Sequence, residues 1–441
     1  MKTLTPLDGR RYVAGTLSLP AVDPLAGADV LGLPSVYWER PLAREAAAGW
    51  GEAAAAGAVD AAGAAQLLEA LGTGPRLRWL DDAPAGLPGP WFGGMRFAAG
   101  APSAAAGAGA ALSWEAFGHA RWVLPELLVW REGAGLRVAA FAAEDGGGED
   151  RVRSRLERVR AAFPASYRHA AEGTQRLQLS ASREAFEARV ETALQAIHSG
   201  ALEKVVLARA IDAEAEQPFA LVDVLARLRE QNPRCATFLL RAPDGSAFVG
   251  ATPETLCRVE GCELETEALA GSAPPAQAQA LAGRDKELRE HVSVVQGIRE
   301  ALAPLSRDVR AEAAPAVLAL KHVVHLRTGI QAQLREDVGP AALVAALHPT
   351  PAVGGAPRER ALRFLAEHEA LDRGWYAGPV GWVGPQRAHL VVALRSALVE
   401  GTRARLFVGA GIVQGSDPAA EWRETELKGV AMRRALGEAH V

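Results

Sequence analysis

The sequence predicts an α+β fold with a mainly antiparallel sheet. Runs of strand-like segments are interrupted by helical segments, and the two kinds do not alternate regularly along the chain. A Pro-Asp-Gly turn at residues 243–245 joins two of the strand-like segments as a hairpin. The 441 residues allow up to three domains at about 150 residues each, and one large mixed domain fits equally well.

The first 165 residues contain short apolar segments separated by clusters of turn-forming residues. They are rich in Ala, Gly and Trp, with turns around 83–90 and an Ala/Gly tract at 98–111 that is typical of a surface loop. The pattern predicts strands at 122–128 and 136–141, a Gly-rich turn at 143–150 and a charged helix at 151–162.

The clearest helix in the rest of the chain is predicted at residues 183–199. Apolar residues recur there at helical spacing, Ser182 precedes them as a suitable N-cap, and Gly200 follows as a stop. The segment 203–211 is β-branched and apolar, which predicts a strand. The later predicted elements are strands at 236–241, 247–251, 256–259 and 262–270, a helix at 288–302, strands at 323–334, 380–383, 388–398 and 405–409, and a last helix from Pro418.

Composition and charge exclude several classes of protein. With 49% hydrophobic and 23% charged residues, the chain is globular rather than disordered or fibrous. Its 48 basic and 52 acidic residues leave a net charge of -4, which argues against a nucleic-acid partner. The three cysteines are too few for a disulfide framework and indicate a reducing compartment. Neither a signal peptide nor a membrane span is recognisable, so we expect a soluble cytoplasmic protein.

The C-terminal segment combines a strand, a glycine-containing loop and a helix. Gly409, Gly411 and Gly415 suggest a dinucleotide site, because glycines let backbone N–H groups approach phosphates at a helix N-terminus. Carboxylates at the start of the helix would repel those phosphates unless a cation intervened. Asp417 as N-cap and Pro418 as first residue explain the helix start without any function.

Glu421, Glu424 and Lys428 fall on one face of that last helix. They form either an exposed face with a Glu–Lys pair four residues apart or part of a site for a hard cation such as Mg²⁺. Glu290 on the earlier helix is a candidate third carboxylate. Both interpretations remain open at this level.

Lys204 and Glu254 are candidates for acid–base chemistry. The chain has lysine only at 2, 204, 286, 321 and 428, and a lysine, unlike an arginine, can lose its proton. Lys204, at the start of an apolar strand, is either a strand-end residue that reaches solvent or a base. Glu254 follows Thr252-Pro253 in a bend, where a carboxyl group serves the turn or faces a pocket.

His322 and His325 resemble a metal-binding pair. Residues three apart on a strand face opposite sides, so we do not predict a zinc site there.

Eight stretches of the sequence form a recognisable set: EKVVLARA (203–210), FVGATPETL (248–256), EALAGSAP (267–274), KELREHVSVV (286–295), HLRTGI (325–330), LHPTPAVGGAP (347–357), RGWYAGPVGW (373–382) and GAGIVQGSDPAAEWRETELK (409–428). Together and in this order they resemble the chorismate-utilising enzymes, and among them the isochorismate synthases. The resemblance is strong over about residues 180–437 and weak before them. It implies one large α+β domain with layered, mainly antiparallel sheets flanked by helices. Within that domain, residues 1–165 would be a variable part and residues 166–441 the chorismate-binding catalytic core.

The resemblance also implies roles for individual residues. Lys204 would be the base that activates water for attack at C2 of chorismate, and Glu254 the acid that helps the C4 hydroxyl leave. The Mg²⁺ ligands would be Glu290, Glu421 and Glu424. The implied substrate-binding residues are Gly271, Ser272, Tyr376, Arg395, Gly411 and Lys428, with His325 as a pocket residue of open role. Ser272 replaces the more usual Thr of the family and keeps the hydroxyl.

Three positions distinguish branches of the family. Relatives that use ammonia usually lack the lysine matching Lys204, so its presence favours water as nucleophile. Aminodeoxychorismate synthases commonly carry a lysine where this chain has Ala270, and salicylate synthases tend to have Thr where it has Ala352. The resemblance therefore implies an isomerase that makes isochorismate for menaquinone or siderophore biosynthesis without a glutamine amidotransferase partner. Salicylate synthase is the alternative enzyme, and a non-catalytic metal-dependent binding module is the alternative of a different class.

Overall fold

The computed structural model describes residues 10–20, 23–84, 86–98, 112–163, 174–281 and 283–438. Within these residues the strands form two sheets, one of 13 strands and one of 10. The larger sheet has the order β10 (Leu177–Ser180), β11 (Lys204–Ala215), β23 (Arg403–Val413), β22 (Ser396–Glu400), β13 (Ala247–Thr252), β12 (Ala236–Arg241), β2 (Val36–Arg40), β3 (Glu45–Trp50), β8 (Leu127–Glu132), β9 (Gly135–Ala143), β1 (Arg11–Leu19) and β5 (Arg76–Trp79), with β19 (Gly355–Ala356) on β11.

The smaller sheet contains the remaining strands. Its order is β16 (Ser306–Ala311), β18 (Val324–Leu334), β15 (Glu263–Ala273), β14 (Thr255–Glu260), β21 (Arg387–Val392), β20 (Pro379–Gly384), β6 (Trp91–Met95), β7 (Ala120–Leu124) and β4 (Ala54–Ala58), with β17 (Ala316–Ala319) on β18. Among the pairs of named strands in the described residues, β1 with β5 is parallel and the others are antiparallel.

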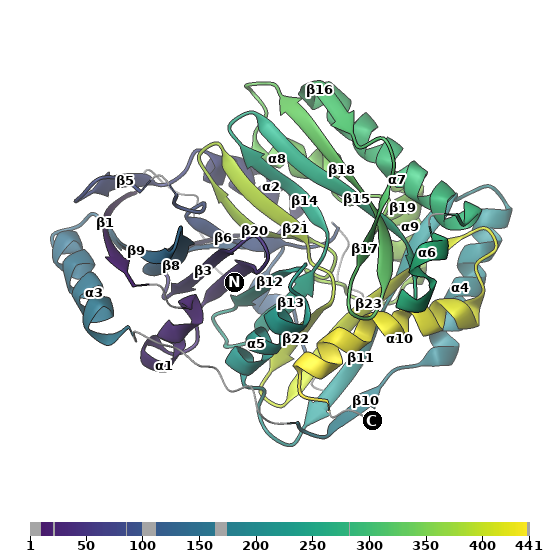
Figure 1. Cartoon of the computed structure of the whole chain (residues 1–441), viewed down its shortest axis with the longest axis horizontal. Coiled ribbons are helices and arrows are strands. Elements are labelled where there is room, and N and C mark those ends of the chain that lie inside the picture. Colours follow the sequence, from purple (N-terminus) through teal and green to yellow (C-terminus); the bar gives the residue numbers. More distant parts are fainter. Residues whose placement is uncertain are drawn as a thin grey trace.

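Helices flank the two sheets (Figure 1). They are α1 (Ala28–Leu31), α2 (Ala61–Gly72), α3 (Gly148–Ala162), α4 (Arg183–His198), α5 (Leu221–Gln231), α6 (Ala278–Leu281), α7 (Asp285–Leu302), α8 (Pro340–Leu347), α9 (Arg358–His368) and α10 (Pro418–Ala435). Helix α10 packs on β23 of the larger sheet, and α7 packs on β15 and β18 of the smaller sheet. The predicted α+β class with two layered, mainly antiparallel sheets is confirmed.

In both sheets a block of strands from the early part of the chain pairs edge to edge with a block from the late part. In the larger sheet β2 pairs with β12, so that Trp38 lies opposite Phe238. In the smaller sheet β6 pairs with β20, so that Phe92 lies opposite Trp382. The first 165 residues therefore share continuous hydrogen-bonded ladders with the rest of the chain.

Local capping explains the helices that the sequence predicts. The Ser182 side chain accepts a hydrogen bond from the Ala185 N–H at the start of α4, and Asp417 accepts one from the Ala420 N–H at the start of α10. The predicted helix at 288–302 is α7, which begins three residues earlier, at Asp285. The predicted loop at 98–111 lies, apart from its first residue, outside the described residues.

Two predicted single strands are wrong, because each is two strands in different sheets. The predicted strand 122–128 is divided at Pro125 between β7 of the smaller sheet and β8 of the larger sheet. Proline has no N–H to donate to a ladder, which makes it a natural break. The predicted strand 388–398 is divided between β21 and β22, and Arg395 between them has a φ of 48°.

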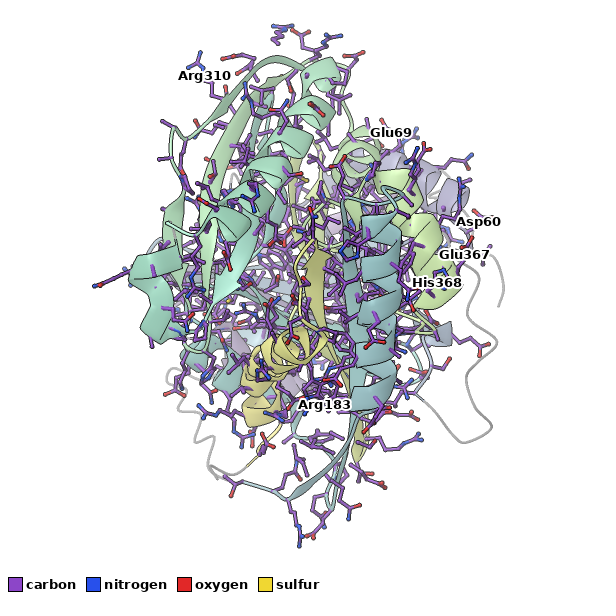
Figure 2. All side chains as sticks on the ribbon, turned by 90° about the vertical axis from the view of Figure 1, so that its right-hand side faces the viewer. Asp60, Glu69, Arg183, Arg310, Glu367 and His368 are labelled. Carbon is purple, nitrogen blue, oxygen red and sulfur yellow. The ribbon has the colours of Figure 1, made fainter. Side chains whose placement is uncertain are left out.

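Most apolar residues pack inside the layers, and most charged residues lie outside, apart from a few buried ones such as Lys204, Glu254 and Arg373. Buried aromatic side chains meet in the interior, where Trp114 contacts Phe117 and Phe248 edge-on. Figure 2 shows Asp60, Glu69 and Arg310 at the periphery, pointing away from the ribbon. No helix among the described residues is long and apolar enough to cross a membrane.

Candidate active site

A cavity lies between the two sheets and collects almost all of the predicted site residues. Its walls come from β11 and β23 of the larger sheet, β15 and β18 of the smaller sheet, and helices α7 and α10. The predicted residues that line it are Glu254, Ala270, Gly271, Ser272, Glu290, His325, Ala352, Tyr376, Arg395, Gly411, Glu421, Glu424 and Lys428. Lys204 is not part of the lining itself, but it contacts the lining residue Glu290.

Two neighbouring connections carry the chain from one sheet to the other and supply cavity residues. Glu254 lies between β13 of the larger sheet and β14 of the smaller sheet, and Arg395 lies between β21 and β22. Hydrogen bonds tie the connections together: the Val392 N–H donates to the Glu254 carbonyl at 3.0 Å, and the Thr252 hydroxyl donates to the Val392 carbonyl at 2.5 Å. The crossing of the sheets thus places a carboxyl group and a guanidinium at one cavity.

Glu254 occupies an environment that favours its protonated form. Its residue surface is only 3% exposed. Burial raises the pKa of Glu254 to about 8, and the nearby carboxylate of Glu267 acts in the same direction. A hydrogen bond from the Thr350 hydroxyl, at 3.3 Å, and the charges of Lys204 and Lys428 oppose this shift without cancelling it. At neutral pH the side chain is therefore suited to donate a proton.

Lys204 is buried at the first residue of β11, with 5% of its surface exposed. Its Nζ donates to Glu290 Oε1 at 2.7 Å. The backbone of Gly411 on β23 passes close to this pair: a Cβ added there would lie 3.1 Å from both Glu290 Oε1 and Lys204 Cε. Glycine at this position leaves room for the ammonium and its partner.

A second lysine–glutamate pair lies on α10. Lys428 Nζ contacts Glu424 Oε1 at 2.6 Å and donates to the Gly409 carbonyl at 3.0 Å. Glu421, one helical turn before Glu424, is buried and lines the same cavity. Of the two interpretations of this helix face, the structure supports a face turned to a cavity, and it also contains the expected Glu–Lys pair.

The carboxylates of Glu290, Glu421 and Glu424 have the right chemistry for a hard divalent cation, because oxygen ligands are what Mg²⁺ prefers. They come from two helices and line one cavity. Among the described residues, however, no three His, Cys, Asp or Glu side chains converge tightly enough to hold a metal ion as they stand. Glu290 and Glu424 each contact a lysine instead, so a cation there would have to compete with an ammonium group.

Arg395 and His325 form the cationic end of the cavity. Arg395 Nη2 donates to His325 Nε2 at 2.8 Å, and His325 Nδ1 lies 3.3 Å from the Gly271 carbonyl and 3.1 Å from the Ser272 hydroxyl. Arginine has no acceptor, so Nε2 must accept and the ring proton belongs on Nδ1. Burial lowers the pKa of His325 well below its ordinary value, and the Arg395 charge acts in the same direction. His325 is thus a neutral acceptor that orients Arg395.

A β-bulge shapes the wall opposite His325. The register between β15 and β18 shifts between Ala270 and Ser272, and Gly271 between them has a φ of 73°. This left-handed conformation favours glycine over any residue with a side chain.

On another wall of the cavity, Tyr376 stacks on Phe407 with ring centroids 5.3 Å apart, and burial raises the pKa of Tyr376 above its ordinary value.

His322 and His325 are not partners. His322 precedes β18 and its Nε2 lies 3.4 Å from Arg434, whereas His325 faces the cavity.

Sequence reasoning missed three residues at or beside the cavity. Thr350 donates to Glu254, Glu267 influences its ionisation, and Arg373 lines the cavity while its guanidinium donates to the Val206 carbonyl at 2.6 Å. All three lie inside stretches that carry the family resemblance. The Thr350–Glu254 and Arg373–Val206 contacts join residues 96 and 167 positions apart, so residue spacing alone did not reveal them.

The chain is similar to known proteins over most of its length. A family model described as chorismate binding enzyme matches residues 5–437. The chain is 37% identical to the salicylate biosynthesis isochorismate synthase of Pseudomonas aeruginosa, over 98% of this chain and 91% of that protein. It is 38% identical to isochorismate synthase MenF of Bacillus subtilis, over 56% of this chain and 54% of that protein.

A solved structure extends the similarity to the fold. MenF, the menaquinone-specific isochorismate synthase from Escherichia coli, is 29% identical in sequence and superposes with a TM-score of 0.78. The superposition covers 96% of this chain and 94% of that one. Taken with the cavity between the sheets, the match over residues 5–437 means that the chain belongs to the family of chorismate-binding enzymes.

Proposed function

We propose that this protein is an isochorismate synthase, which converts chorismate to isochorismate by adding water at C2 and releasing the C4 hydroxyl. The observation that carries this proposal is a buried lysine, Lys204, in contact with the lining of a cavity that also contains a buried carboxyl group, Glu254, whose pKa is raised. Moving a hydroxyl between ring carbons needs a base on the attacking water and an acid on the leaving group. The isochorismate synthases among its relatives support the same assignment.

The proton transfers balance between the two residues. Lys204, in its neutral form, takes a proton from water as the oxygen forms its bond to C2. Glu254 gives its proton to the C4 oxygen as the C4–O bond breaks, so that water leaves. Lys204 ends as an ammonium and Glu254 as a carboxylate, and a proton exchange with solvent restores both for the next turnover.

The cationic residues of the cavity suit a dianionic substrate. The chain as a whole carries a net charge of -4, so chorismate depends on local donors for binding. Arg395 and Lys428 supply positive charge, Tyr376 a hydroxyl, and the glycine backbone at 271 and 411 leaves space for close approach. We assign the substrate carboxylates to this set together with Ser272.

We also propose Mg²⁺ as the cofactor, with Glu290, Glu421 and Glu424 as its protein ligands. Their oxygen chemistry and shared cavity support this assignment. A bound Mg²⁺ ion supplies positive charge to a substrate carboxylate. To bind the ion, Glu290 and Glu424 would have to give up their ion pairs with Lys204 and Lys428. Metal binding would therefore change the positions of both lysines.

The reaction is proposed to stop at isochorismate and to need no amidotransferase partner. Ala352 lines the cavity where salicylate synthases tend to have a threonine, and Ala270 stands where aminodeoxychorismate synthases commonly have a lysine. Water rather than ammonia is the proposed nucleophile because Lys204 is present.

Turnover in ¹⁸O-labelled water tests the proposal. Purified protein is incubated with chorismate and Mg²⁺, and the products are separated and analysed by NMR and mass spectrometry. We expect isochorismate with ¹⁸O at C2, no pyruvate and no salicylate. Lys204→Gln and Glu254→Gln, which keep most of the side-chain volume, should bind chorismate and give no product. Product without the label would exclude attack by solvent water, and release of pyruvate with salicylate would identify a salicylate synthase.

A further inference from the structure

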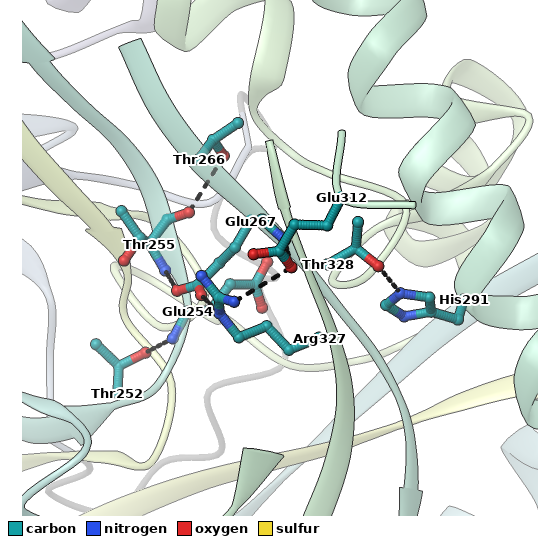
Figure 3. Close-up of polar contacts among 10 residues, drawn as sticks. Thr252, Glu254, Thr255, Thr266, Glu267, His291, Glu312, Arg327 and Thr328 are labelled. Atoms are coloured by element: carbon teal, nitrogen blue, oxygen red, sulfur yellow. Dashed lines mark hydrogen bonds and ion pairs between the residues drawn. The ribbon is translucent and has the colours of Figure 1, made fainter. Parts of the chain in front are cut away.

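Glu267 on β15 lies beside the proposed acid but outside the lining of the cavity. Its side chain is 12% exposed and has two partners. One carboxylate oxygen accepts the Thr255 N–H at 3.0 Å, and the other accepts Arg327 Nε at 2.7 Å. Figure 3 shows Glu267 and Arg327 grouped next to Glu254. A nearly buried carboxylate that does not face the substrate therefore contacts the residue following the proposed acid.

The backbone hydrogen bonds explain why a side chain is needed there. Strands β14 and β15 pair from Arg258 to Glu260, and the ladder does not extend back to Thr255. The pairing of β14 with β21 is also irregular between Thr255 and Cys257. Side chains of β15 replace the missing ladder: Glu267 accepts the Thr255 N–H, and the Thr266 hydroxyl donates to the Leu256 carbonyl at 2.8 Å. The bend that carries Glu254 is thus held by a carboxylate.

The charge of Glu267 acts on Glu254 as well. After burial, it is the largest influence that raises the Glu254 pKa. The other groups that act on Glu254 are Lys204 from β11, Lys428 from α10 and the hydroxyl of Thr350, and Glu254 in turn acts on Tyr376.

Arg327 does not cancel the charge of Glu267. Its guanidinium is shared with Glu312, at 3.5 Å, so the three side chains together keep a net negative charge.

We propose that Glu267 is a positioning residue for Glu254: it holds the bend through Thr255, and its negative charge adds to burial in disfavouring ionisation of the acid. This inference rests on the proposed function, because it needs Glu254 to be the acid. The step it serves is the transfer of the Glu254 proton to the C4 oxygen as the C4–O bond breaks. An acid that ionised before substrate arrived would have no proton to give.

Glu267→Gln separates the two parts of the role. The amide oxygen still accepts the Thr255 N–H, while the negative charge is lost and Arg327 is left less neutralised. Both changes favour ionised Glu254, so the basic limb of kcat/KM against pH should move down by about one pH unit. Arg327→Gln leaves Glu267 uncompensated and should move the same limb up. Opposite shifts from the two partners of one ion pair are not expected if the pair only supports the fold.

Glu312→Gln is the matched comparison. Glu312 also pairs with Arg327, but its side chain is half exposed, so its charge is partly screened by solvent. Because Arg327 then pairs with Glu267 alone, the limb should move down in this variant by less than in Glu267→Gln. Glu267→Ala, which removes the Thr255 contact as well as the charge, should also lower kcat at its own optimum by more than Glu267→Gln does.

The outcomes distinguish this inference from the proposed function. If Glu254→Gln keeps its turnover, Glu254 is not the acid and the proposed function fails with it. If Glu254→Gln is inactive while Glu267→Gln and Arg327→Gln leave the limb in place, the proposed function stands and the role of Glu267 is wrong. A further outcome is equal losses of kcat in the Glu267, Arg327 and Glu312 variants with no movement of the basic limb. That outcome would mean that the ion pair between Glu267 and Arg327 only supports the fold. Melting temperatures of all variants check folding.

Discussion

Arg395 donates a hydrogen bond to Nε2 of His325 at 2.8 Å, and this contact makes the histidine an acceptor. Because Nδ1 faces the Gly271 carbonyl, the ring is neutral and carries its proton on that side. The consequence is that Arg395, and not His325, supplies the charge at this end of the cavity. His325 sets the direction in which that charge points.

Loss of this acceptor should weaken substrate binding. In His325→Ala, Arg395 loses a buried partner, which costs about 1–3 kcal/mol and should raise KM for chorismate by about tenfold or more. His325→Gln offers an oxygen acceptor and should recover part of the loss. His322→Ala is the control, because His322 lies outside the cavity lining. Equal KM values in the His325→Ala and His322→Ala variants would contradict the orienting role.

Lys204 should be irreplaceable by another cation. Lys204→Arg keeps the positive charge and its contact with Glu290 but cannot act as a base, so kcat should fall by about 10²–10⁴-fold, as in Lys204→Gln. Binding of chorismate, measured by calorimetry, should persist in both variants. If Lys204→Arg keeps most of the wild-type rate, Lys204 only supplies charge and the base is another group.

The three proposed Mg²⁺ ligands should each control the requirement for metal. Glu290→Gln, Glu421→Gln and Glu424→Gln keep the side-chain size and remove a charged ligand, so each should raise the Mg²⁺ concentration needed for half-maximal turnover. Glu426→Gln is the control on the same helix, because Glu426 pairs with Arg209 and Arg433 and does not line the cavity. An unchanged Mg²⁺ requirement in all three ligand variants would refute the assignment.

His389 should make stability depend on pH. Burial lowers its pKa well below the ordinary value, and neither of its ring nitrogens has a hydrogen-bond partner. The unfolded chain therefore binds a proton at His389 below about pH 6.5 that the folded chain does not, and stability falls as pH falls by about 1.4 kcal/mol per pH unit. His389→Phe, which preserves the contacts with Trp38 and Trp382, should flatten the decline of melting temperature between pH 6.5 and 5.

The exposed His368 on α9 provides the matched control for that measurement. His368→Gln should leave the slope of melting temperature against pH unchanged. A wild-type slope in His389→Phe would mean that other groups set the acid sensitivity of the fold.

The sequence predicted what depends on neighbouring residues and missed what depends on distant ones. The starts of α4 and α10 follow from Ser182 and Asp417, which act within three residues. The exchange between sheets at Arg395 was missed because buried apolar residues stand on both sides of it. Strands β21 and β22 are both buried, so the hydrophobic pattern is the same before and after the crossing.

The candidate site shows the same division. Lys204, Glu254 and the carboxylates were found from stretches that resemble a family, and the structure gathers them at one cavity. The contact between Thr350 and Glu254 joins residues 96 positions apart and has no local pattern. The role of Glu267 becomes visible only in the structure, where its carboxylate on β15 accepts the N–H of Thr255 in the bend.

The pairing of early with late strands makes residues 166–441 dependent on the beginning of the chain. A fragment that started at residue 166 would lack β2 and β6, the ladder partners of β12 and β20. Each of these strands would then present an open row of N–H and C=O groups where the sheet is now continuous, and such open edges pair with other chains. Removing the first third of this protein would therefore produce an aggregating fragment rather than a smaller enzyme.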